Sequence, residues 1–176
     1  KVLVIDGDIR RGYMHAQLGG ENNYGLSDFL ASVDKTPDGG TVDKNNLSTI
    51  IQKTKVPNLH FIPRGTAAPN PSELLMHPRM EKMLAKLGEF YDYVLIDTPP
   101  ILAVTDAAIV GRYAGTSLLV ARFGDTPAKE VEATVKRFAQ NGVDVRGVIL
   151  NGVERRASGY YGYGYGYSYG YSYKNE

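Results

Sequence analysis

The stretch VLVIDGDIRR at residues 2–11 joins a continuous apolar run to a cluster of charged side chains. A second stretch of the same design, YVLIDTPP, occupies residues 93–100. Two further apolar runs follow, TSLLVARF at 116–123 and VRGVILNGV at 145–153. Runs rich in Val, Ile and Leu that do not alternate with polar residues are typical of parallel strands covered by helices on both faces. These four segments therefore predict the strands of a buried parallel sheet.

Helical patterns lie between these runs. Apolar residues recur with the spacing of one helix face over 80–87, and again over 131–138. The second helix is expected to start at Thr126-Pro127, with Pro at its first position. The segment NPSELL at 70–75 begins with the capping pattern of a helix, with Asn before Pro and Glu three positions after Asn. Alternating strands and helices predict an α/β fold with a parallel sheet flanked by helices. Residues 34–46 are polar and turn-rich, and they predict a mobile loop.

Composition excludes several classes of protein. The chain has 176 residues and a net charge of +1, so one domain with a tail is expected, without an electrostatic basis for binding nucleic acid. It has no Cys, which excludes disulfides and thiolate metal sites, and its three His are scattered. No apolar run approaches the roughly 20 residues that span a membrane. Because the chain begins at Lys1 rather than Met, we interpret it as a piece of a longer protein that lacks the N-terminal part.

The C-terminal segment YYGYGYGYSYGYSYKNE at 160–176 carries eight of the 13 tyrosines and has no Leu, Ile, Val or Phe. Such a segment cannot bury enough apolar surface to offset its ordering entropy, so we divide the chain into a core at 1–154 and a disordered tail at 155–176. An exposed array of phenols suits an enzyme that modifies tyrosine. A self-associating low-complexity segment is a second interpretation, and a strand with its phenols on one face is a third, which the glycines disfavour. The candidate acceptors are Tyr160, Tyr161, Tyr163, Tyr165, Tyr167, Tyr169, Tyr171 and Tyr173.

Acidic side chains follow two of the predicted strands. Asp6 ends the first predicted strand, at 2–6, and Asp8 lies two residues beyond it, while Asp97 ends the second, at 93–97. Ligands of open α/β sheets bind beyond the carboxyl ends of the strands, and Mg²⁺ takes one or two carboxylates together with several waters. A single Asp in such a place is more often the cap of a turn. Two such motifs at matching positions favour a shared Mg²⁺ site, with one of the first pair free to accept a proton.

These residues carry a resemblance to a known family. Three apolar residues followed by Asp6-x-Asp8-x-Arg10 resemble the Walker A′ motif of bacterial tyrosine kinases, and VLIDTPP at 94–100 resembles their Walker B motif. The segments at 70–75, 105–107 and 120–132 and the Tyr-rich end are also similar to that family. The resemblance covers essentially the whole chain, and it points to the cytoplasmic domain of kinases that control capsule and exopolysaccharide export. The Walker B stretch alone would also fit ATPases related to MinD and ParA.

The resemblance implies a P-loop NTPase fold of the MinD/ParA type and a protein-tyrosine autokinase activity. In that reaction the γ-phosphate of ATP passes to C-terminal tyrosines of neighbouring subunits. By resemblance, Asp6 is the base or orienter that faces the tyrosine hydroxyl, and Asp8 and Asp97 bind Mg²⁺. Arg10 is expected near the active site or a subunit contact. Asn151, at the end of the last strand, is expected to approach the adenine.

One departure from the family is the absence of the phosphate-binding sequence G-x-x-x-x-G-K-[ST], which provides the phosphate-cradling backbone and a Lys. In the family it precedes the Asp-x-Asp-x-Arg strand, as does a helix that packs subunits into a ring. We therefore expect the chain to lack the N-terminal strand and Walker A loop of the fold, to bind ATP poorly and to be inactive on its own.

For the parent protein, we expect a homo-oligomeric ring at the cytoplasmic face of the bacterial inner membrane. The family implies a cognate tyrosine phosphatase and the polysaccharide export machinery as partners, and no nucleic acid. Two other function classes stay open. One is an ATPase of the MinD/ParA type whose tail mediates assembly, and the other is a non-catalytic assembly module with a self-associating tail.

Overall fold

The computed structural model describes residues 1–31 and 47–153. The predicted loop at 34–46 and the Tyr-rich tail at 155–176 lie outside the described residues. No helix within the described ranges is long and apolar enough to cross a membrane.

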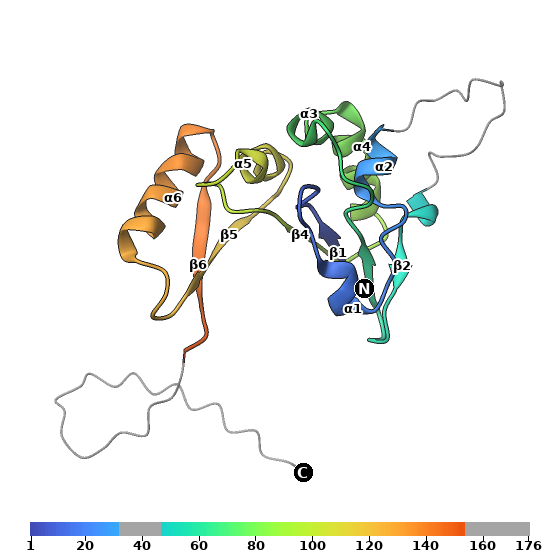
Figure 1. The fold of residues 1–176 in the computed structure, drawn as a ribbon, viewed down its shortest axis with the longest axis horizontal. Coiled ribbons are helices and arrows are strands. Elements are labelled where there is room, and N and C mark those ends of the chain that lie inside the picture. Colours follow the sequence, from blue (N-terminus) through green and yellow to red (C-terminus); the bar gives the residue numbers. More distant parts are fainter. Residues whose placement is uncertain (32–46, 154–176) are drawn as a thin grey trace, which may run out of the picture.

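The strands of the described residues form two sheets (Figure 1). The first contains β1 (Val2–Asp6), β2 (Gln52–Lys53), β3 (Leu59–Ile62) and β4 (Tyr93–Asp97), in the order β2-β3-β1-β4. β1 is parallel to both β3 and β4, and β2 is an antiparallel edge strand. The second sheet pairs β5 (Ser117–Arg122) with β6 (Val145–Asn151) in parallel. All four predicted strands are confirmed, whereas β2 and β3 were not predicted.

The helices of the described residues are α1 (Met14–Leu18), α2 (Leu26–Ala31), α3 (Pro71–Leu75), α4 (Pro78–Gly88), α5 (Asp106–Gly111) and α6 (Ala128–Gln140), with a 3₁₀ turn at Leu47–Thr49. The three helices expected from sequence are α3, α4 and α6. Pro127 is the residue before α6 rather than its first residue. The remaining helices have five or six residues, which is too short for a periodic pattern. The mixed α/β sheet flanked by helices confirms the predicted fold class.

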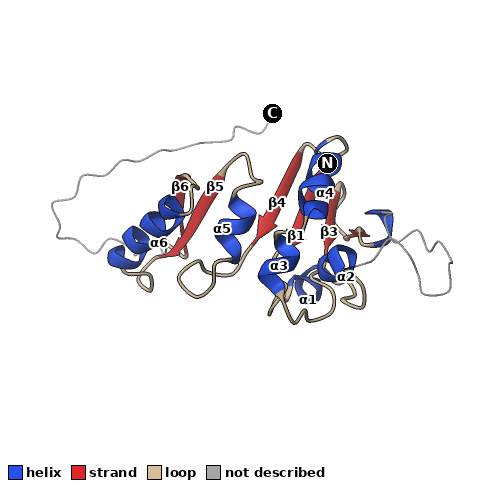
Figure 2. Cartoon of the chain, turned by 90° about the horizontal axis from the view of Figure 1, so that it is seen from above, coloured by secondary structure: helices blue, strands red, loops and turns tan. Residues whose placement is uncertain are grey.

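The main core lies against the first sheet. Leu3 and Ile5 of β1 are completely buried, and they share one apolar cluster with Met80, Met83 and Leu87 of α4. Burying side chains of this size stabilises the fold by about 1.5–3 kcal/mol each. Figure 2 shows β6, β5, β4, β1 and β3 as a row of strands, with α3, α5 and α6 on the same side of the row.

Burial of both faces was expected for the apolar strands, and this is wrong for β4, β5 and β6 in the described structure. Tyr93 and Leu95 of β4 are 68% and 55% exposed, and Leu118 and Val120 of β5 are 57% and 62% exposed. The described helices pack on one face here, so alternate residues of each strand face solvent. Exposed apolar surface of this kind marks a place where another part of a protein packs.

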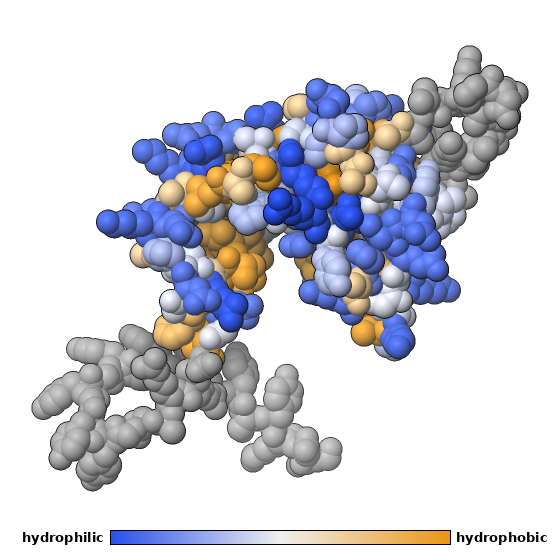
Figure 3. Space-filling view, in the orientation of Figure 1, coloured by the Kyte–Doolittle hydropathy of each residue, from blue (hydrophilic) through white to orange (hydrophobic). Residues whose placement is uncertain are grey.

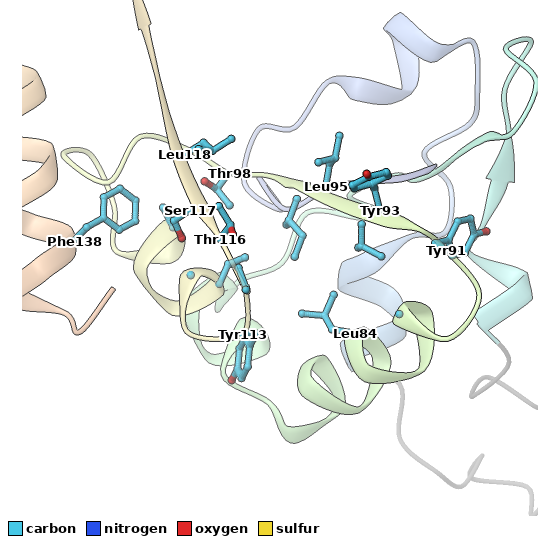
Figure 4. Close-up of a pocket in the computed structure, with 18 of the residues that line it drawn as sticks. Leu84, Tyr91, Tyr93, Leu95, Thr98, Tyr113, Thr116, Ser117, Leu118 and Phe138 are labelled. Atoms are coloured by element: carbon cyan, nitrogen blue, oxygen red, sulfur yellow. The ribbon is translucent and has the colours of Figure 1, made fainter. Parts of the chain in front are cut away.

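A groove separates the two sheets. β4 pairs with β1 and β5 pairs with β6, but no ladder joins β4 to β5 within the described residues. The groove has a volume of about 580 Å³, and its walls include Tyr93, Leu95, Thr116 and Leu118 (Figure 4). Figure 3 shows the hollow between the two halves of the molecule, with hydrophobic side chains along one wall. Both of its long sides are therefore strand edges with unpaired backbone groups.

Candidate active site

The first feature of the site is the register of two acidic strand ends. Asp6 is the last residue of β1, Asp97 is the last residue of β4, and the two are direct partners in the parallel ladder. Asp8 follows two residues beyond β1. Burial raises the pKa of Asp6, and the charges of Asp97 and Asp8 raise it further. The three carboxylates therefore influence one another at the carboxyl edge of the first sheet, as expected for parallel strands.

Asp6 lies beneath the loop that follows β1. Its side chain is 0% exposed, and its Oδ2 accepts a hydrogen bond of 3.1 Å from the backbone N–H of Met14. Oδ1 is buried without a hydrogen-bond partner in the described structure. A Cβ at Gly12 would stand 2.0 Å from this Oδ1, so the backbone of Gly12 rests directly on the carboxylate. An Asp6 that accepts a proton from a tyrosine stays a prediction, and it requires this loop to open.

Asp8 organises a tight turn and keeps one oxygen available. Its Oδ1 accepts hydrogen bonds from the backbone N–H groups of Arg10, at 3.1 Å, and Arg11, at 2.9 Å. Its backbone carbonyl accepts from the N–H of Gly12 at 2.7 Å. One oxygen of the Asp8 carboxylate, Oδ1, therefore caps the turn, as a single Asp after a strand often does. The other has no hydrogen bond to the described residues, which leaves it available to a cation.

Asp97 is the last residue of β4 and borders a cavity. Its side chain is exposed and contributes to the wall of a cavity of about 420 Å³, together with Thr98, Thr126 and Glu130. Desolvation by the surrounding chain raises the pKa of Asp97 although part of the side chain meets solvent, and the charge of Asp8 raises it further. Asp97 is thus a carboxylate with room for a ligand beside it.

The carboxylates fit a water-rich Mg²⁺ site rather than a closed metal cage. Within residues 1–31 and 47–153, no three His, Cys, Asp or Glu side chains form a group that would hold a metal ion. Mg²⁺ usually takes one or two carboxylates and keeps several waters, or takes phosphate oxygens instead. Asp8 and Asp97 could provide two such ligands, and a cation there would relieve the repulsion that contributes, after desolvation, to the raised pKa of Asp97.

The guanidinium of Arg10 is hydrogen-bonded to a fourth acid, Asp106. Its Nε donates to Oδ2 of Asp106 at 2.6 Å, and its Nη2 donates to Oδ1 of Asp106 and to Oγ of Ser72, both at 3.1 Å. Ser72 Oγ also donates to Oδ1 of Asp106 at 2.8 Å. Burial acts to raise the pKa of Asp106, but the hydrogen bonds from Arg10 and Ser72 and the charge of Arg10 lower it overall. Sequence reasoning missed Asp106 and Ser72, whose only signal was their place inside segments similar to the family.

The last candidate residue among the described ones belongs to the other sheet. Asn151 ends β6 in the second sheet, where it is exposed and is the register partner of Arg122. Its Oδ1 accepts a hydrogen bond of 2.9 Å from the N–H of Gly152. The eight candidate acceptor tyrosines lie outside the described residues. The described site therefore consists of the three acids and the loop that covers one of them.

The raised pKa of Asp97, caused first by its desolvation and then by the charge of Asp8, predicts a pH-dependent change in stability. A raised pKa means that folding penalises the ionised form, and this penalty vanishes as the pH falls towards the ordinary value of 3.8. Asp97→Asn should therefore increase the free energy of unfolding near neutral pH, and the gain should shrink towards about pH 4. Urea denaturation of both proteins across this range measures the difference. Equal or lower stability of the variant at neutral pH would show that folding does not penalise the ionised form of Asp97.

Comparison with known proteins identifies the class to which this fold belongs. Residues 1–122 match the AAA domain family. The chain therefore belongs to the AAA domain family, and its fold is that of a P-loop NTPase. The septum site-determining protein MinD from Pyrococcus horikoshii, solved with Mg-ADP, shares this fold with a TM-score of 0.62 at 22% identity. That similarity covers 85% of this chain and 57% of the MinD chain.

Within this class, the homologues at about 50% identity are bacterial tyrosine kinases. The chain is 52% identical over 164 residues to tyrosine-protein kinase wzc of Salmonella typhimurium, which covers 93% of this chain and 21% of that protein. The solved kinase domain of Escherichia coli tyrosine kinase ETK is 50% identical with a TM-score of 0.79, over 94% of this chain and 60% of that one. The chain thus spans about a fifth of the length of the curated relatives it matches.

Proposed function

We propose that this chain carries the phosphoryl-transfer site of a protein-tyrosine autokinase, which moves the γ-phosphate of ATP to C-terminal tyrosines of neighbouring subunits. One observation carries the proposal, namely the register of Asp6 with Asp97 at the carboxyl edge of the sheet, with Asp8 just beyond. Identity of about 50% to tyrosine-protein kinases supports the reaction class. Phosphoryl transfer depends mainly on positioning and charge stabilisation, for which a set of fixed carboxylates around a cation is suited.

Each acid has a part in this proposal. Bound Mg²⁺ would neutralise the negative charge that the transferring phosphate carries. The free oxygen of Asp8 and the carboxylate of Asp97 would hold the cation, because both lie at the sheet edge beside open space. Asp6 would accept the proton of the tyrosine hydroxyl, and its raised pKa makes it a stronger base than an exposed Asp. The covering loop would have to open for this step, because Gly12 rests on the carboxylate.

The groove between β4 and β5 supports a nucleotide site that residues outside 1–176 complete. Its two sides are unpaired strand edges with apolar side chains, so one more strand would pair with both and join the sheets. We infer that this strand leads into a phosphate-binding loop, which these 176 residues lack. Asn151 would then approach the adenine from the end of β6. On this account the chain alone is inactive.

Phosphorylation of the tail would add charge with a regulatory effect. Each phosphate adds roughly −1.5 to −2 charges to a tyrosine at neutral pH. Several phosphates on adjacent tails of a ring would repel one another and loosen the oligomer. We propose that this charge regulates capsule and exopolysaccharide polymerisation and export at the cytoplasmic face of the inner membrane, and that a cognate tyrosine phosphatase removes it.

Mass spectrometry of the complete protein after incubation with ATP and Mg²⁺ tests this function. We expect phosphotyrosine at several of the positions 160–173 in each chain, and chelation of Mg²⁺ should abolish the modification. Hydrolysis of ATP without phosphotyrosine would instead indicate an ATPase of the MinD/ParA type. Absence of both would leave a non-catalytic assembly module and refute the proposal.

A further inference from the structure

Residues 7–12, here called the acidic loop, are tied to the protein at three places. At its start, the N–H of Gly7 donates to the carbonyl of Asp97 at 2.8 Å. In its middle, Ile9 is 0% exposed and belongs to the main core. At its end, Gly12 rests on the buried carboxylate of Asp6, and its carbonyl accepts a hydrogen bond of 2.9 Å from Nε of Arg64. These ties fix the ends and the apolar side of the loop.

The polar side of the loop is fixed by Arg10. The guanidinium of Arg10 makes two hydrogen bonds to the carboxylate of Asp106 and one to the hydroxyl of Ser72. Asp106 is the first residue of α5 and is 0% exposed, and Ser72 lies in α3, which packs against α5. Both helices are therefore hydrogen-bonded to the loop through the Arg10 side chain.

Arg10 is also directly bonded to the acid that the loop carries. Its backbone N–H donates to Oδ1 of Asp8 at 3.1 Å, and the adjacent N–H of Arg11 donates to the same oxygen. Any displacement of Arg10 therefore displaces a hydrogen-bond donor of Asp8. Hydrogen bonds therefore connect Asp106 of α5 and Ser72 of α3 to Arg10. One further hydrogen bond connects Arg10 to the Asp8 carboxylate.

A purely stabilising role explains this cluster poorly. Burying an ion pair costs so much desolvation that well-packed apolar residues would often serve stability equally well. A planar, two-bond contact between guanidinium and carboxylate instead fixes direction as well as distance. The buried Asp106 holds the guanidinium of Arg10 in one place, although the Arg10 side chain is 36% exposed and would otherwise be free to move.

We propose that Asp106 and Ser72 are positioning residues, which act through Arg10 to set the place of the Asp8 carboxylate relative to Asp97. The inference rests on the proposed function, in which these two carboxylates hold the divalent cation. On this proposal, α3 and α5 orient the Asp8 carboxylate through their hydrogen bonds to Arg10.

Three measurements on the complete protein test the inference in Asp106→Asn. Hydrogen exchange without metal should show faster exchange at the amides of residues 10–12, because the loop loses its tie. Binding of Mn²⁺ in the presence of ADP, followed by electron paramagnetic resonance, should weaken by roughly tenfold. The phosphorylation rate at saturating Mg²⁺ should change much less than the Mg²⁺ concentration for half-maximal rate. Arg10→Lys, which keeps the charge, should retain part of the affinity.

Ser72→Ala provides a milder variant in case Asp106→Asn does not fold. It removes one hydrogen bond on Asp106 and should weaken Mn²⁺ binding by about threefold, in the same direction. Asp28→Asn is the matched control, because Asp28 clamps another pair of loops through Gly25 and Thr66 and makes no contact with Arg10. We expect this control to lower stability without changing the affinity for Mn²⁺.

The outcomes separate this inference from the proposed function. Unchanged exchange at 10–12 and unchanged Mn²⁺ affinity in both cluster variants would overturn the positioning role, even if the protein phosphorylates tyrosine normally. Equal weakening by Asp28→Asn would also overturn it, because general destabilisation would then explain the effect. Weakened Mn²⁺ binding in a protein that makes no phosphotyrosine would support the positioning role and refute only the kinase proposal. A wild-type protein that binds no Mn²⁺ with ADP would overturn the inference together with the metal assignment.

Discussion

Replacing Asp8 or Asp97 by Asn in the complete protein should lower tail phosphorylation by roughly 10³-fold or more, about 4 kcal/mol in the barrier, while the fold survives. Each change preserves side-chain size but removes a negative charge from the edge of the sheet. The substituted side chain would still offer an oxygen, yet a neutral amide binds Mg²⁺ much more weakly than a carboxylate. Phosphotyrosine in the tail, quantified by mass spectrometry under initial-rate conditions, measures the loss.

The control for these variants is another Asp→Asn change on the surface. Asp144 is exposed and makes a 3.7 Å ion pair with Arg146, which is worth little at the surface. Asp144→Asn should therefore keep normal activity and stability. Circular dichroism and urea denaturation should show that the Asp8 and Asp97 variants are folded. Phosphotyrosine near the wild-type amount in both variants would refute the metal assignment.

The second large effect concerns the acceptors. Changing all eight tyrosines at 160–173 to Phe should remove nearly all phosphotyrosine while the core keeps its stability. A single replacement should have little effect, because the neighbouring phenols are chemically equivalent on a Gly-rich tether. Addition of a separate peptide with the sequence of residues 160–173 should restore detectable labelling by the eight-Phe protein. A large loss from one single replacement would show instead that one position is selected by its surroundings.

The strands and long helices were predictable because their sequences are continuous or periodic. β1, β4, β5 and β6 are runs of Val, Ile and Leu, and α4 and α6 have a clear apolar face. β3 was missed because it is four residues long and contains His60. The ring of His60 is bonded to the hydroxyl of Tyr91 at 2.7 Å, so a tertiary contact accommodates a polar residue that a strand pattern would exclude.

The acids were predictable as a group but not in their individual surroundings. Parallel strands end at one edge, so Asp6 and Asp97 had to be neighbours once their strands paired. The burial of Asp6 depends on Gly12, whose missing side chain lets the loop close on the carboxylate. The contact of Arg10 with Asp106 joins residues 96 positions apart, and no local pattern reports it. The apolar runs do not specify which strands pair, so the separation into two sheets could not be predicted from them.

The central claim is that this chain belongs to a kinase that phosphorylates the tyrosine tail of a neighbouring subunit. Mixing two complete proteins tests it most directly: one carries Asp97→Asn and an intact tail, and the other has an intact site but lacks residues 155–176. After addition of ATP and Mg²⁺, we expect phosphotyrosine on the tail of the Asp97→Asn protein, at a rate that rises with the concentration of the active partner. An unmodified tail in this mixture, together with concentration-independent labelling of an intact active chain, would contradict transfer between subunits.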